Sequence, residues 1–143
     1  MAVTEHDRKH MALAQLETAL RLYFEGQDYY SVISLAGAAD EILGQLLAAN
    51  GIDSSLETMK KSAVAIYKHL TGETIDGSAI AQRANLARNS LKHWGPGQPP
   101  IIAFDAREEA QDMLNRAVDN YWALDYQLSP AMEQFQRESM IRI

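Results

Sequence analysis

The sequence predicts an all-α protein, built as an up-and-down bundle of four to five main helices plus a short C-terminal helix. Three observations lead to this prediction. Apolar residues recur at helical spacing in almost every segment, no segment alternates as a strand would, and the breaks between segments are short. The length of 143 residues fits one domain, 1–143, which can bury a core without the disulfides that the lack of cysteine excludes.

The first two helices are predicted from their apolar stripes and from the residues that flank them. The first is expected from Thr4, as N-cap, to Phe24, and the second from a capping Asp28 to Ala49. An Asn-Gly pair follows the second helix and suits the left-handed conformation in which many helices end. Residues 34–39 are mostly small, so a neighbouring helix can approach this part of the second helix closely.

Start signals mark most of the remaining helices. A Ser-x-x-Glu capping box opens one, an Asp-x-x-Glu box opens another, and a serine followed by proline opens the last. The expected segments are 54–71, 78–93, 105–127 and a short helix from Ser129.

Charge is unevenly distributed along the chain. Residues 56–95 carry six lysines and arginines against three acids, whereas the whole chain has a net charge of −6. A central basic block favours an anionic ligand, although a solvated helix face would look the same. No apolar run approaches the ~18 residues of a membrane span, and the N-terminus lacks an apolar signal region. We therefore expect a soluble, cytoplasmic protein that does not enter a membrane.

The expected helix 78–93 carries the strongest candidate site. Arg88 and His93 are five residues apart, and Asn85, Asn89 and His93 share one ridge at a spacing of four. Histidine can transfer protons near neutral pH, and a guanidinium can bind phosphate oxygens through parallel hydrogen bonds. Positions five apart differ by about 140° around a straight helix. The two groups therefore converge only if the last turn deviates or a second subunit contributes.

The segment Arg88-Asn89-Ser90-Leu91-Lys92-His93 resembles the Arg-x4–6-His motif of the HEPN family, the higher eukaryote and prokaryote nucleotide-binding domains. These are helical bundles whose catalytic members are metal-independent ribonucleases. The small-residue-rich second helix with Ala39-Asp40-Glu41 and the long helix after the motif are also similar to this family. The resemblance implies that His93 is the general acid/base, that Arg88 clamps the phosphate and that Asn89 orients the imidazole or a phosphate oxygen.

The resemblance also implies a homodimer with a cleft across its two-fold axis, RNA as substrate, and neither cofactor nor metal. Members of the family are often toxins paired with a nucleotidyltransferase. Lys92 and Asn85 would contact the substrate, and Asp40 and Glu41 would hold Arg88. The alternative is a non-catalytic HEPN-like module that binds a nucleotide or a protein partner, which the acidic net charge favours. In the plainest alternative, Arg88 only pairs with an acid and the histidine only ends a helix.

Other candidates have simpler explanations as solvated, capping or packing residues. They are His6 and His10, which are spaced for a metal with Asp7 between them; the acids Glu108, Glu109 and Asp112; and the aromatic residues Tyr29, Tyr30 and Trp94, which could stack on bases.

Overall fold

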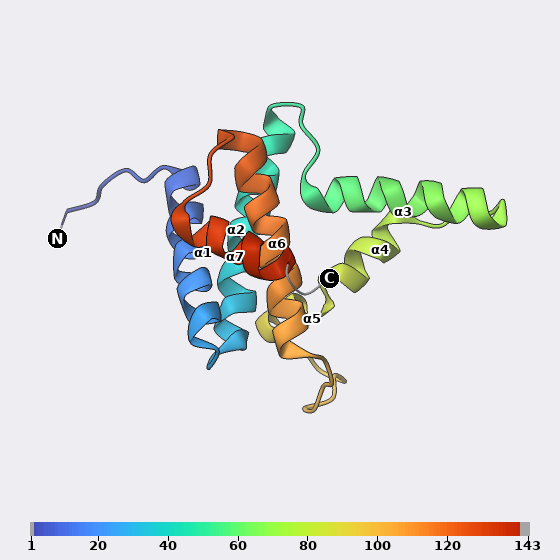
Figure 1. The fold of residues 1–143 in the computed structure, drawn as a ribbon. Helices are drawn as coiled ribbons and strands as arrows, with labels where there is room; N and C mark the ends of the chain where they lie inside the picture. Colours follow the sequence, from blue (N-terminus) through green and yellow to red (C-terminus); the bar gives the residue numbers. More distant parts are fainter. Residues whose placement is uncertain (1, 141–143) are drawn as a thin grey trace.

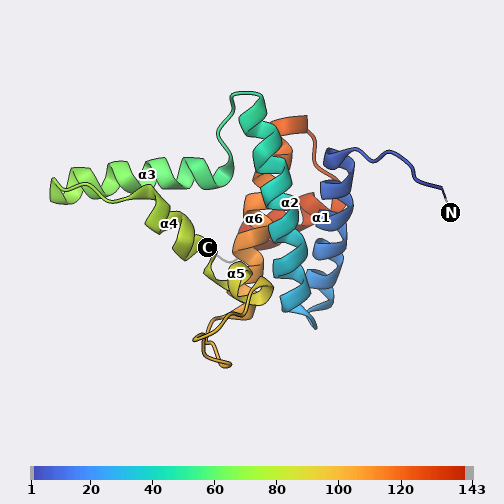
Figure 2. The same cartoon turned by 180° about the vertical axis from the view of Figure 1, so that it is seen from behind.

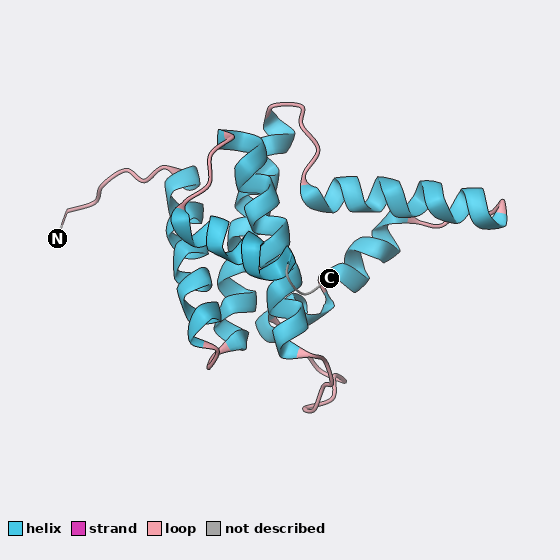
Figure 3. Ribbon diagram, in the orientation of Figure 1, coloured by secondary structure: helices cyan, strands magenta, loops and turns pink. Residues whose placement is uncertain are grey.

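The computed structural model describes residues 2–140, and these form seven helices joined by loops, without a strand (Figures 1 and 3). The all-helical bundle that the sequence predicts is confirmed. The helices are α1 (Arg8–Glu25), α2 (Tyr29–Ala49), α3 (Ser55–Thr71), α4 (Gly77–Ala84), α5 (Leu86–Lys92), α6 (Ala106–Asp125) and α7 (Pro130–Met140).

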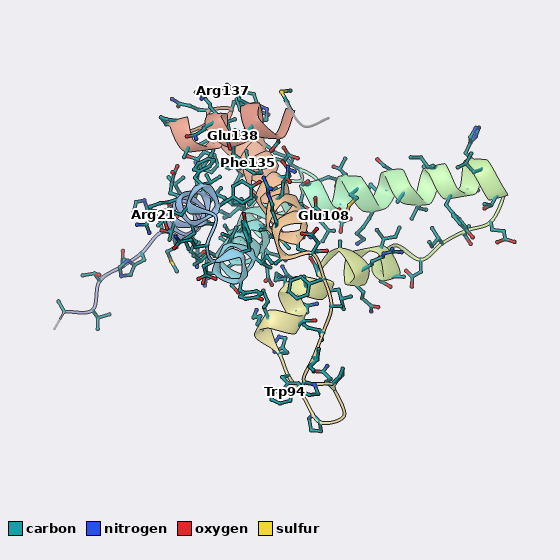
Figure 4. All side chains as sticks on the ribbon, turned by 60° about the horizontal axis from the view of Figure 1, so that its bottom comes forward. Arg21, Trp94, Glu108, Phe135, Arg137 and Glu138 are labelled. Carbon is teal, nitrogen blue, oxygen red and sulfur yellow. The ribbon has the colours of Figure 1, made fainter. Side chains whose placement is uncertain are left out.

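The core lies where α1, α2 and α6 run side by side, with α2 packed against both of the others (Figures 1 and 2). Helix α7 crosses this group and contributes Phe135, which is fully buried (Figure 4). The ring of Phe135 is edge-on to that of Tyr23 in α1, with 5.4 Å between the ring centroids. The apolar stripes expected to face the core are confirmed in part. Met11 of α1 and Trp94, which follows α5, are exposed. Fully or almost fully buried residues include Leu16 and Leu20 of α1, and Ala110, Met113, Leu114, Ala117, Val118 and Tyr121 of α6.

Helix α2 is apolar because it is the central helix of the bundle. It is the one helix among residues 2–140 that is long and apolar enough to cross a membrane, with a hydropathy of 1.4. Eight of its residues, including Leu43 and Leu47, are buried inside the bundle. Its apolar composition therefore fits a helix at the centre of the bundle.

Helices α3 and α4 leave the bundle and form an arm, residues 55–84. Helix α3 projects sideways, the loop after it runs back along α3, and α4 slants from there towards α5, as both views show (Figures 1 and 2). Neither helix has a buried residue, and large apolar side chains such as Ile66 and Leu70 are exposed. The sequence analysis counted these two segments among the helices of the bundle, whereas they lie outside it. A helical period in the sequence does not reveal whether the apolar stripe of a helix packs against a partner.

The predicted caps are confirmed at four helices. The hydroxyl of Ser129 accepts from the backbone N–H of Met132 in the first turn of α7 at 3.3 Å. The side chains of Asp28, Ser54 and Asp105 accept hydrogen bonds from backbone N–H groups in the first turns of α2, α3 and α6, at 3.0, 3.2 and 3.0 Å. The prediction for the first helix is wrong at its start. Asp7, not Thr4, is the N-cap, and its carboxylate accepts from the N–H of Lys9.

Candidate functional site

The predicted helix 78–93 is in fact two helices, broken at Asn85. Helix α4 ends at Ala84 and α5 begins at Leu86. Nη1 of Arg116 in α6 donates to Oδ1 of Asn85 at 2.8 Å and approaches the carbonyl oxygen of Ala84 at 3.5 Å. Because this guanidinium is buried, it needs acceptors from its neighbours, and the break supplies them. The prediction of one continuous helix is wrong because the partner that interrupts it lies 31 residues away.

A cluster of polar side chains connects α2, α5 and α6. We call Asp40, Arg88, Arg116 and Asn120 the polar junction. Oδ2 of Asp40 accepts from Nη2 of Arg116 at 2.6 Å, and Oδ1 accepts from Nδ2 of Asn120 at 3.1 Å. The side chains of Asp40, Arg116 and Asn120 are buried. The junction therefore holds a charged pair inside the bundle, where hydrogen bonds must offset the loss of water.

The polar junction also attaches both ends of the arm to α6. Oδ1 of Asn120 accepts from the backbone N–H of Ser55, where α3 begins, at 2.8 Å. Arg116 binds Asn85, where α4 ends. Arg116 and Asn120 are four residues apart, which is about 6 Å along a helix axis. The arm therefore leaves the bundle and returns to it at adjacent turns of α6.

The electrostatics of the junction follow from burial. Removal from water raises the pKa of Asp40 above its usual range, while Arg116, Arg88 and Asn120 act in the opposite direction. With Glu41 beside the cluster, two carboxylates face two guanidinium groups. The charges balance, so this side of α5 is not a strongly positive surface.

Arg88 extends from α5 along α2 and reaches the junction past Gly37. A Cβ atom at Gly37 would lie 2.9 Å from Cγ of Arg88 and closer still to Cδ, so only glycine leaves this path open. Nη1 of Arg88 lies 4.0 Å from Asp40 and 3.9 Å from Glu41, beyond hydrogen-bond distance. Nε of Arg88 is buried and has no partner among the described residues. Arg88 is thus held near the two predicted acids, yet much of its hydrogen-bonding capacity is unused.

His93 lies at the other end of α5, where it is the C-cap residue. Its backbone N–H donates to the carbonyl oxygen of Asn89 at 2.9 Å, and its side chain is exposed. Asn89 and His93 line a surface hollow of about 700 Å³ together with Trp94. Lys92 is exposed beside them, in the last turn of α5, where a cation is favoured by the helix dipole.

Within one chain, α5 divides the predicted site residues between two hollows. Asp40, Glu41, Asn85 and Arg88 line a cavity of about 500 Å³ at the root of the arm. Asn89 and His93 line the separate hollow at the end of α5. A single chain therefore does not bring Arg88 and His93 to one point, as the 140° separation on a helix indicated.

Sequence reasoning missed Arg116 and Asn120, although a signal for them was present. Both fall in α6 among the residues of its apolar stripe, three or seven positions after Met113. A polar residue inside a buried stripe requires a buried partner. Asp40, the acid that directly follows the small-residue segment 34–39 of α2, is that partner.

The weaker candidates do not form a metal site among residues 2–140, where no group of three histidine, aspartate or glutamate side chains gathers. His6 lies before the start of α1, so His6 and His10 do not share a helix face. Glu108 and Glu109 lie in the first turn of α6, where the helix dipole favours acids (Figure 4). Burial, together with the neighbouring carboxylates, raises the pKa of Glu109.

Comparison with models of known protein families, with curated proteins and with solved structures found no significant match for this chain.

Proposed function

We propose that the chain is a HEPN-type ribonuclease that cleaves RNA without a metal, as a homodimer in the cytoplasm. The observation that carries this proposal is the chemistry of α5. It presents an exposed imidazole at its end and, five residues earlier, a guanidinium whose Nη1 lies 4.0 and 3.9 Å from Asp40 and Glu41, beyond hydrogen-bond distance. A phosphate oxygen is an acceptor that such a guanidinium lacks.

The reaction needs two proton transfers. A base takes the proton of the 2′-hydroxyl, the 2′-oxygen attacks phosphorus, and the bond to the 5′-oxygen breaks as an acid protonates that oxygen. The products are a 2′,3′-cyclic phosphate and a 5′-hydroxyl. His93 from each of two copies supplies the base and the acid, Arg88 stabilises the charge on the phosphate oxygens, and Asn89 orients the imidazole or an oxygen.

The homodimer is part of the proposal because one chain separates the two groups. Two copies related by a two-fold axis near α5 place the His93 of one copy opposite the α5 of the other. Lys92, exposed beside His93, adds attraction for the substrate. Asn85 has a structural partner in Arg116 through its oxygen, which leaves only its amide NH2 for a substrate. A nucleotidyltransferase as the partner of a toxin pair belongs to the same proposal.

The test is a ribonuclease assay of the purified dimer in EDTA, with His93→Ala compared with His69→Ala. His69 is an exposed histidine on the arm and serves as the matched control. Loss of the acid/base group should lower the cleavage rate about 10²–10⁴-fold, whereas His69→Ala should cleave like the wild type. Arg88→Lys should also lose activity, because an ammonium cannot form the parallel hydrogen bonds of a guanidinium. Wild-type activity in His93→Ala would refute the assigned chemistry.

One observation favours a second function. The acids beside Arg88 balance its charge, so the same chain would suit a non-catalytic HEPN-like module that binds a nucleotide or a protein. This function predicts that the wild-type dimer cleaves none of several RNAs, and that Arg88→Lys leaves ligand binding unchanged.

A further inference from the structure

The hollow at the end of α5 has a composition that the phosphate chemistry does not use. It is lined by apolar and polar side chains from α5 and from the loop that follows, namely Leu86, Asn89, Ser90, His93, Trp94, Gln98, Pro99, Pro100 and Ile102. The loop hangs below the helices, with Trp94 at its start (Figure 4). The volume of about 700 Å³ lies within the range of small-molecule sites.

Trp94 is exposed, but its ring is fixed by its own loop. The indole Nε1–H donates to the carbonyl oxygen of Gln98 at 3.1 Å. The turn between them is closed by two hydrogen bonds, from the N–H of Gly95 to Oε1 of Gln98 at 2.9 Å and from the N–H of Gln98 to the oxygen of Gly95 at 3.1 Å. Gly97 takes a φ of +81°, which favours glycine. Trp94 is 74% exposed, and these hydrogen bonds therefore hold its ring in an exposed position.

The other side chains that line the hollow suit a planar ligand with polar groups along its edge. Leu86 and Ile102 line the hollow and offer exposed apolar surface. The amide of Asn89 can donate and accept, and that of Gln98, whose oxygen already accepts from Gly95, can donate through its NH2, which suits the hydrogen-bonding edge of a base. An aromatic ring that stacks on a base tolerates any base, while the amides select among them.

We propose that this hollow is a nucleobase subsite, in which one base of a single-stranded RNA stacks on Trp94. This inference rests on the proposed function, because RNA is its ligand. His93 directly precedes Trp94, so a base held on the indole places its own sugar and phosphate next to the imidazole. The hollow thereby sets which phosphodiester is cleaved relative to the stacked base.

The test uses the fluorescence of a single indole. The chain has two tryptophans, and Trp122→Phe leaves Trp94 as the only one. Adenosine and cytidine 5′-monophosphates should quench its emission with saturation, whereas ribose 5-phosphate, which lacks a base, should not. Quenching of equal size by ribose 5-phosphate would show a phosphate site and overturn the proposal.

A second measurement uses equilibrium dialysis with labelled nucleotide, so that the tryptophan itself can be changed. Trp94→Ala should weaken binding roughly 5- to 150-fold, the equivalent of about 1–3 kcal/mol of stacking. Trp94→Phe should retain part of the affinity, and Trp122→Phe, at the exposed tryptophan of α6, should retain all of it. Equal binding by Trp94→Ala and wild type would overturn the proposal.

The two proposals fail in different ways. Cleavage that depends on His93, without base-dependent quenching, would remove the subsite and leave the ribonuclease. Base-dependent quenching without cleavage would leave the subsite and remove the ribonuclease. If the hollow instead holds an apolar side chain of another protein, nucleotides will neither quench nor be retained in dialysis, and the subsite is refuted.

Discussion

The two ends of α5 face different environments, although they carry one sequence motif. At the start, Arg88 lies half-buried against α2 in the polar junction, where its path depends on Gly37. At the end, His93 and Trp94 face an open hollow. The difference teaches that a motif defined by spacing can place its first residue among groups that stabilise the fold and its last residue in an open hollow. Substitutions at the two ends should therefore differ in their effect on stability.

The largest difference in the free energy of unfolding is expected between the variants Asp40→Ala and His93→Ala. Removal of the Asp40 carboxylate leaves the guanidinium of Arg116 buried without its 2.6 Å partner, which should lower the free energy of unfolding by about 3–5 kcal/mol. His93 is exposed, so its loss should change that free energy by no more than about 0.5 kcal/mol. Urea denaturation followed by circular dichroism measures both values. Equal losses would show that the hollow is as important to the fold as the junction.

Replacing either of two glycines of α2 by alanine should change the stability by a smaller amount, and the sign of the change should differ between the two positions. Gly37→Ala forces Arg88 from its path and should cost about 1–3 kcal/mol, typical of overpacking. Gly44→Ala is the matched control on the same helix, because its Cβ would meet Ser54 at an ordinary 3.5 Å.

Gly44→Ala should instead stabilise the protein by roughly 0.5–1 kcal/mol, since alanine is the better helix former. Thermal denaturation of both variants measures the sign. Stabilisation by Gly37→Ala would mean that Arg88 does not need its place beside α2.

The smallest effect concerns pH, and it too should arise on the junction side. Asp119 precedes Asn120 on α6 and is exposed as a residue, but the partial removal of its carboxyl group from water raises its pKa, while a hydrogen bond with Ser55 acts in the opposite direction. The carboxyl group of Asp119 therefore binds its proton more tightly in the folded state than in the unfolded chain, where its pKa is 3.8. Stability conferred by the protonated group is therefore lost as the pH rises above about 4. Asp119→Asn should gain stability relative to wild type at pH 7, and the gain should vanish below pH 3.8.

Asp76→Asn, at the N-cap of α4, should behave in the opposite way. Hydrogen bonds from Ser78 lower the pKa of Asp76, so wild type loses this contribution as the pH falls through its lowered value. Urea denaturation between pH 3 and pH 7 distinguishes the two variants. Parallel pH profiles for Asp119→Asn and Asp76→Asn would contradict the assignment.

The accuracy of the sequence prediction depended on how local each signal is. Caps such as Ser54 and Asp105 act within one turn, so their sequence context identifies them. The break at Asn85 and the polar junction depend on Arg116 and Asn120, which meet residues 31 to 80 positions away. Such pairs become visible only when the chain is folded. The grouping of Arg88 with Asp40 and Glu41 was foreseeable in part, whereas its separation from the imidazole follows from how α5 sits on α2.

Residues 55–84 leave and rejoin the bundle at adjacent turns of α6. This detour therefore does not bridge two distant parts of the bundle. The chain travels far outward and comes back almost to its starting point, while no side chain of the detour is buried in the core. A short linker between the two anchoring positions would close the same path, so length and sequence in this stretch can vary through evolution or by engineering. Helices α1, α2 and α6, in contrast, carry most of the buried core, so an insertion within them would displace packed side chains.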